Sequence, residues 1–270
     1  MMIFPSTSAG RAGALAAVCA TALSVAIIGA ASASAAENTL PFNHAALTAN
    51  RHTVAGRNAA VSGRNATLTS SRGQVPAPCT TTVTGTHVTP LTVTHGKTCL
   101  VNATQDAQVM VGPGASLSAT NSEINGTVTA AKAASVTYCG SAENGILTVT
   151  GTTGAVTLGG TLPGRAACAS DTITGLVTIS GTAGQVAVSR LKDTGTLTLS
   201  GNTGGITLNG IILSGLAYVQ SNTGKAAVTV SGNSINGLLA CTGNTPAPGD
   251  NHAVNTVNGI ASGQCTRLAG

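Results

Sequence analysis

Six carboxylates downstream of residue 78 are the side chains best suited to chemistry in this sequence. They are Asp106, Glu123, Glu143, Asp171, Asp193 and Asp250. Glycosidic hydrolysis needs two carboxyl groups about 5–9 Å apart, and a calcium site needs several oxygen ligands together. No two of the six are adjacent, and Asp171 and Asp193 stand at different distances from the glycines that follow them, Gly175 and Gly195. The spacing therefore predicts neither a catalytic pair nor a calcium site.

A second group that could do chemistry lies between residues 79 and 99, where Cys79, His87, His95 and Cys99 occur together. A zinc site is one interpretation, but the spacing differs from that of a zinc finger, and a disulfide is the favoured alternative. The chain has no Gly-x-Ser-x-Gly elbow and no phosphate-binding Gly-x-x-x-x-Gly-Lys motif. We therefore expect no catalytic residue, no metal and no other cofactor.

Threonine and serine recur two residues apart in three segments that resemble one another. These residues are Thr148, Thr150, Thr178, Ser180, Thr198 and Ser200. On extended strands they would share one outward face and form a candidate surface array. The plainer alternative is that threonine suits any exposed strand, because its β-propensity is high.

The elements that must position these residues repeat along the chain. Four segments begin with glycine and alternate apolar with small polar residues: "GILTVTGTTGAVTL" (145–158), "GLVTISGTAGQVAV" (175–188), "GTLTLSGNTGGITL" (195–208) and "GLAYVQSNTGKAAV" (215–228). Alternation with a period of two indicates strands with one buried face. A longer period of about 20 residues indicates a stacked array of coils.

Aligning the four segments places aliphatic residues in columns. The first two are Leu147, Val177, Leu197, Ala217 and Val149, Ile179, Leu199, Val219; after the turn come Val156, Val186, Ile206, Ala226 and Leu158, Val188, Leu208, Val228. One coil cannot bury its inner face alone, whereas stacked coils bury the columns continuously. The sequence predicts an all-β, single-stranded parallel β-helix over 79–270, with about 20 residues per coil and about eight coils between Cys79 and Ala240.

Turns and chain ends complete this prediction. Asn202 and Asn222 stand one period apart in the turn and are expected to form a hydrogen-bonded ladder, or simply to suit the turn. Segment 241–265, with Pro246 and Pro248, is predicted to be a capping loop that protects the last coil. An excess of ten residues around 162–171 is interpreted as a loop outside the stack.

Six cysteines follow residue 78, and we expect them to hold the coils by disulfides. They are Cys79, Cys99, Cys139, Cys168, Cys241 and Cys265. An even number in an exported chain favours disulfides, and the spacing suggests sequential pairing. Each bridge would then close a loop of roughly 20–30 residues and contribute ~3 kcal/mol.

The N-terminal third carries targeting signals rather than repeats. Arg11 precedes an apolar run at 12–30 and then small residues, which predicts a signal peptide over 1–36; the alternative is an uncleaved anchor. Segment 37–78 holds four arginines and few large apolar residues, which predicts a flexible basic arm. The arm is either a spacer or a contact to an acidic polymer. We expect a secreted, extracellular protein with no transmembrane segment after cleavage.

The coils resemble the right-handed parallel β-helix of pectate-lyase-like proteins over about 79–240. Enzymes of that family use clustered aspartates with basic residues, and none of those catalytic residues can be matched here. The tail at 241–265 resembles small exported actinobacterial proteins of unassigned function. The Thr-x-Thr array is similar to the ice-binding face of solenoid antifreeze proteins.

Composition narrows the range of functions and partners. Aromatic residues make up 1% of the chain, which argues against binding nucleic acid or glycans by ring stacking. We expect a non-catalytic structural or surface-interaction protein whose partner is unknown, with a cell-wall polymer or another surface as the candidates. The alternatives are a polysaccharide lyase or hydrolase, by analogy of fold, and an ice- or surface-binding solenoid.

Overall fold

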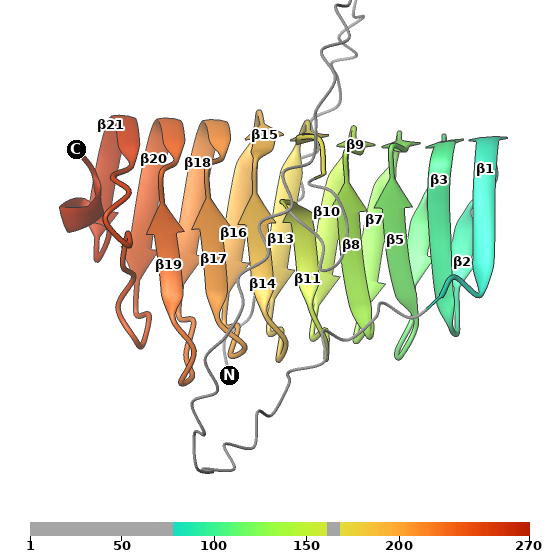
Figure 1. Cartoon of the computed structure of the whole chain (residues 1–270), viewed down its shortest axis with the longest axis horizontal. Coiled ribbons are helices and arrows are strands. Elements are labelled where there is room, and N and C mark those ends of the chain that lie inside the picture. The colour runs from blue at the N-terminus through green and yellow to red at the C-terminus, as the bar shows by residue number, and fades with distance from the viewer. Residues whose placement is uncertain (1–77, 161–167) are drawn as a thin grey trace, which may run out of the picture. The chain divides into compact units, whose positions relative to one another are not determined.

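The computed structural model describes residues 78–160 and 168–270. The predicted signal peptide (1–36), nearly all of the predicted arm (37–78) and most of the predicted loop around 162–171 lie outside the described residues. The described part is a parallel β-solenoid of about nine turns with about 20 residues per turn. Figure 1 shows the coils side by side, from β1 at one end to β21 at the other.

The elements are short strands separated by tight turns, followed by one 3-10 helix. In chain order they are β1 Thr81–His87, β2 Leu91–Val93, β3 Lys97–Gln105, β4 Val109–Val111, β5 Ser116–Thr120, β6 Glu123–Ile124, β7 Thr127–Ala131, β8 Ser135–Cys139, β9 Ala142–Glu143, β10 Ile146–Thr150, β11 Val156–Gly159, β12 Asp171–Ile173, β13 Leu176–Ser180, β14 Val186–Ser189, β15 Leu191–Asp193, β16 Thr196–Ser200, β17 Ile206–Asn209, β18 Ile212–Gln220, β19 Val228–Ser231, β20 Ser234–Thr242, β21 Thr256–Gly263 and η1 Thr266–Leu268. Among the described residues, no helix is both long and apolar enough to cross a bilayer.

Strands inside the stack pair in parallel with their equivalents in the coils before and after them. β10 lies between β7 and β13, and its five residues pair with both without a register shift. β11 likewise lies between β8 and β14, and β12 between β9 and β15. The backbone hydrogen bonds therefore run between coils rather than within one coil. Each full coil contributes three strand positions.

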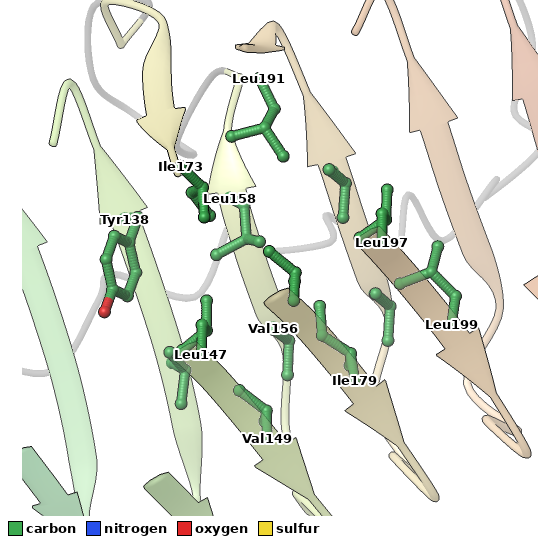
Figure 2. Packing of buried hydrophobic residues seen from close by; sticks show 14 of the residues in the cluster. Tyr138, Leu147, Val149, Val156, Leu158, Ile173, Ile179, Leu191, Leu197 and Leu199 are labelled. Atoms are coloured by element: carbon green, nitrogen blue, oxygen red, sulfur yellow. The ribbon is translucent and has the colours of Figure 1, made fainter. Parts of the chain in front are cut away.

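The interior consists mainly of columns of aliphatic side chains, as the alternation predicts. Leu147, Val177, Leu197 and Ala217 follow one another in register and are at most 1% exposed. Figure 2 shows such residues from neighbouring coils packing together in the middle of the stack. Aliphatic side chains of this size suit a narrow, close-packed interior.

The predicted alignment of the fourth segment is wrong after its turn. Ile206 pairs with Val228, not with Ala226, and Leu208 pairs with Val230, not with Val228. The reason is local, because the segment from Gln220 to Val228 is two residues longer than its counterpart in the preceding coil.

Buried asparagines form the predicted ladder and extend it. Asn202 Nδ2 donates to Asn222 Oδ1 at 3.0 Å, Asn222 Nδ2 donates to Asn244 Oδ1 at 2.9 Å, and Asn244 Nδ2 donates to Gln264 Oε1 at 3.0 Å. Asn222 also bonds to two backbone groups, the Asn202 N–H and the Leu199 carbonyl. The ladder satisfies backbone groups that the turn removes from the strand pairing.

Replacing Asn222 with alanine should lower the free energy of unfolding by about 3 kcal/mol, because it leaves several buried partners without a hydrogen bond. The exposed Asn236 on β20 provides the control, and Asn236→Ala should cost less than ~1 kcal/mol. Urea unfolding of both variants measures the difference. Equal midpoints would show that the ladder contributes no stability.

Three disulfides join the cysteines in the predicted sequential pairs. The Cα–Cα distance is 5.8 Å for Cys79–Cys99, 5.0 Å for Cys139–Cys168 and 5.1 Å for Cys241–Cys265. The first and last bridges lie at the two ends of the stack. The middle bridge joins Cys139, at the end of β8, to Cys168, which precedes β12.

The segment predicted as a capping loop, 241–265, is not a loop throughout. It contains β21, which pairs with β20 over eight residues and forms a further coil. The helix η1 follows it, and Leu268 is buried at 5% exposure. Asn255 Nδ2 donates to the Leu268 carbonyl at 2.9 Å. The alternation in "NTVNGIASG" therefore belongs to the stack, and η1 comes after the last coil.

Candidate functional site

Five of the six carboxylates lie on one side of the solenoid, although their sequence positions look scattered. Glu143 pairs with Ile173, and Ile173 pairs with Asp193, so the two acids share one inward column two coils apart. Each stands two residues before a glycine, Gly145 or Gly195. This shared spacing of Glu143 and Asp193, rather than the unequal spacing of Asp171 and Asp193, indicates in the sequence that two acids lie in one column.

Three of these acids lie inside the solenoid. Glu143 and Asp171 are fully buried, and Asp193 is 2% exposed. Tyr138 Oη donates to Glu143 Oε2 at 3.1 Å, and the Ser141 N–H donates to Asp171 Oδ1 at 2.8 Å. The remaining oxygens, Glu143 Oε1, Asp171 Oδ2 and both of Asp193, accept no hydrogen bond of ordinary geometry. Backbone N–H groups of Gly140 and Gly159 near Asp171, and of Thr194 near Asp193, partly offset the effect of burial on the pKa of these two acids. Figure 2 shows Tyr138 among the aliphatic side chains of this layer.

Burial controls the ionisation of this buried acid cluster, which comprises Tyr138, Glu143, Asp171 and Asp193. Desolvation raises the pKa of Glu143 to about 8, against a smaller lowering by the Tyr138 hydroxyl. Desolvation also raises the pKa of Asp171 and that of Asp193 to about 6. The pKa of Tyr138 rises through burial first and the Glu143 carboxyl second. Glu143 is therefore protonated at neutral pH, and a substrate in solvent does not reach these groups.

An open hollow of about 430 Å³ lies on the outer surface at the same corner. Successive coils line it with Asn102–Thr104, Asn121–Glu123 and Gly140–Ala142, and Ser170 and Thr172 complete it. We call this hollow the corner groove. Its lining consists mostly of amides, hydroxyls and small side chains, with Glu123 as the one carboxylate.

The corner groove follows from a repeated bend in the backbone. Asn102, Asn121 and Gly140 have φ values of 49°, 47° and 64°. This left-handed conformation is accessible to asparagine and glycine. It turns the chain sharply between β5 and β6 and between β8 and β9. The three residues are 19 apart, so this periodicity could have located the groove.

Amide side chains donate hydrogen bonds to the two exposed carboxylates on this side of the solenoid, Asp106 and Glu123. Asn125 Nδ2 donates to Asp106 Oδ1 at 2.8 Å. Asn144 Nδ2 donates to Glu123 Oε1 at 3.0 Å and to Asn125 Oδ1 at 2.8 Å. Each carboxylate thus faces an amide partner.

The four residues considered as zinc ligands, Cys79, His87, His95 and Cys99, make other contacts. Cys79 and Cys99 are joined in a disulfide. His87 Nε2 lies 2.9 Å from the Thr84 carbonyl, and His95 Nδ1 lies 3.0 Å from Thr94 Oγ1. Within residues 78–160 and 168–270, no three His, Cys, Asp or Glu side chains are grouped so as to hold a metal ion.

The hydroxyl array is assembled as its spacing predicts. Thr148, Thr178 and Thr198 pair directly on β10, β13 and β16. Thr150, Ser180 and Ser200 pair in the same way two residues later. The array lies on a different part of the coil from the corner groove.

Comparison with protein-family models, curated proteins and solved structures finds no match for this chain. The resemblance to pectate-lyase-like proteins therefore rests on the solenoid architecture alone, and an architecture of this kind does not specify an activity. The chemistry has to be argued from the residues described above.

Proposed function

We propose that the protein is a secreted, non-catalytic surface-interaction protein that binds a neutral, hydroxyl-rich polymer of the cell surface in the corner groove. One contrast carries the proposal. The carboxyls with raised pKa values lie inside the solenoid, while the accessible hollow offers amides, hydroxyls and a single carboxylate. A hydrolase or lyase would need such carboxyls in reach of its substrate.

The shape of the corner groove suits an extended chain. Its lining residues come from successive coils, which are spaced about 4.8 Å apart, so a polymer lying along the stack would meet equivalent groups at each coil. Each contact is a hydrogen bond exchanged with water and adds little affinity by itself. Repetition along a polymer multiplies such weak contacts through effective concentration.

Export is part of this proposal and rests on two features. The N-terminal residues have the order of a signal peptide, and three disulfides join the six cysteines of the solenoid. Disulfides persist in oxidising compartments. A rigid, low-charge rod is suited to that environment.

Filling the corner groove should weaken binding strongly. Ala142 lines the groove, whereas Ala187 points outward from β14 with similar intermediate exposure. We expect Ala142→Trp to weaken co-sedimentation with purified cell-wall polysaccharide at least tenfold, because the indole occupies the ligand's space. Ala187→Trp should bind as the unmodified protein does.

The same preparations test the enzymatic alternative. Incubation with the polymer should release no new reducing ends and no unsaturated products. Product release that disappears in Glu123→Gln would replace the binding proposal with a catalytic one. Equal binding by both tryptophan variants would remove the groove from the proposal.

A further inference from the structure

The floor of the corner groove contains a ladder of hydrogen bonds that runs from coil to coil. The Ala103 N–H donates to Ser122 Oγ at 3.1 Å, and the Ser122 N–H donates to Ser141 Oγ at 3.2 Å. The Ser141 N–H then donates to Asp171 Oδ1 at 2.8 Å. We call these four residues the groove ladder. The first three line the groove and are at most 5% exposed, so the ladder links the groove floor to a fully buried carboxyl group.

Asp171 is the one ionisable residue in its column among the described residues. The same column contains Asn233 and Asn255 toward the other end of the stack. Their Oδ1 atoms accept from the backbone N–H of the preceding coil, that of Ile211 and that of Asn233, at 3.1 and 3.2 Å. A neutral amide can therefore fill the role of acceptor at this position. A carboxyl group adds a change of charge that an amide or a hydroxyl does not undergo.

The carboxyl of Asp171 lies among donors at the sharp bend of its neighbouring coil. Gly140, with a φ of 64°, forms this bend and lines the groove together with Ser141. Desolvation raises the pKa of Asp171 to about 6, and smaller, opposite contributions come from the N–H groups of Ser141, Gly159 and Gly140. An ionised carboxylate only accepts, which suits this set of donors. Protonation turns one oxygen into a donor that faces N–H groups.

Neighbouring ionisable groups make other contacts. Those on the elements packed against Asp171 are Tyr138 of β8, Glu143 of β9, Lys192 and Asp193 of β15, and Arg190 just before β15; β11 has none. Tyr138 bonds to Glu143, Arg190 Nη2 donates to two backbone carbonyls, and Lys192 is exposed. Burial and the donors at the bend therefore govern the ionisation of Asp171.

We propose that Asp171 is a positioning residue of the corner groove, whose carboxylate fixes the bend at Gly140 and Ser141 and whose protonation loosens this bend. The inference rests on the proposed function and adds a regulation by pH. Loosening moves the lining of one coil out of line with the two coils before it, so a polymer lying along the stack loses aligned contacts. Protonation also removes a buried charge, so the solenoid stays folded while the groove changes.

Binding of the full chain to purified cell-wall polysaccharide, measured by co-sedimentation at pH 5 and pH 7.5, tests the inference. We expect about tenfold weaker binding at pH 5, because only about one tenth of Asp171 is then ionised. Asp171→Asn keeps an acceptor for the Ser141 N–H but cannot ionise, so it should bind weakly at both pH values. Circular dichroism should show it folded.

Asp193→Asn is the matched control. Asp193 is buried and has a pKa raised to about 6 by desolvation, but it neither lines the groove nor belongs to the groove ladder. This variant should keep the pH dependence of binding. Equal binding by the unmodified protein at both pH values would overturn the inference. So would a pH dependence that disappears in Glu123→Gln, since the exposed carboxylate of the groove would then be its source.

The backbone amide of Ser141 gives a readout that needs no ligand. In nuclear magnetic resonance spectra of the full chain, its chemical shift should titrate with a midpoint near pH 6, and this titration should be absent in Asp171→Asn. A Ser141 amide that does not titrate contradicts the inference, whatever the protein binds. An intact titration without binding at either pH supports the role of Asp171 at the bend and contradicts the proposed function instead.

Discussion

Alanine at Gly195 should destabilise the solenoid by at least about 4 kcal/mol. A Cβ atom at this position would overlap the Gly175 carbonyl oxygen and lie 2.7 Å from its carbonyl carbon. Both are backbone atoms of the neighbouring coil and cannot move without breaking the pairing of β13 with β16. The same close approach recurs at Gly215, where a Cβ would overlap the Gly195 carbonyl oxygen.

A second glycine separates this clash from the general cost of replacing glycine. Gly210 has a φ of +60°, and a Cβ there would meet nothing within 4 Å. Gly210→Ala should therefore cost only the ~1–2 kcal/mol of placing alanine in a left-handed conformation. Urea unfolding midpoints of the two variants provide the measurement. The explanation by close coil contact fails if both variants unfold at the same denaturant concentration.

The stability of the solenoid should fall as the pH rises from 5 to 9. The pKa of Glu143 rises from an ordinary 4.5 to about 8 on folding, so between these values the folded state keeps a proton that the unfolded state releases. The free energy of unfolding then decreases by up to ~1.4 kcal/mol per pH unit, and by on the order of 5 kcal/mol across the window. Asp171 and Asp193, with pKa values near 6, add to the loss between pH 4 and 6.

Replacing Glu143 tests whether its carboxyl group causes the pH dependence of stability. Glu143→Gln cannot ionise and retains an oxygen that can accept from Tyr138, so the slope of stability against pH should flatten between pH 6 and 8. Glu123→Gln, at the exposed acid bonded to Asn144, should leave the slope unchanged. Urea unfolding of the unmodified protein and of both variants at pH 5, 7 and 9 gives the slope of stability against pH for each protein. A steep slope that persists in Glu143→Gln would assign the effect to other groups.

The glycine column, which contains Gly175, Gly195 and Gly215, follows the usual sequence expectations, whereas the buried acid cluster violates one of them. Each glycine of the column marks the start of a segment and is visible as a repeat, because every coil must pass the same close contact. The acids break the expectation that ionisable residues face solvent. Their inward direction follows from the alternation in "SAENG" and "LKDTG", since position two before the glycine is inward in every coil.

The solenoid, its period, its aliphatic columns, the pairing of the cysteines, the asparagine ladder and the hydroxyl array could all be predicted from the amino-acid pattern. These features depend on alternation within a strand and on repetition between neighbouring coils of equal length, and both can be read along the chain. The start of the asparagine ladder was predictable for this reason, because Asn202 and Asn222 are one regular period apart.

The alignment of the unequal coils, in contrast, emerges only in the folded molecule. Ten additional residues separate Gly145 from Gly175, and two more lie between Gln220 and Val228. Backbone pairing and core packing return the residues after each insertion to register. These contacts join parts of the chain that are distant in sequence, so no short sequence pattern predicts them. For that reason Val228 rather than Ala226 faces Ile206, and Glu143, Asp171 and the corner groove meet on one side of the coil.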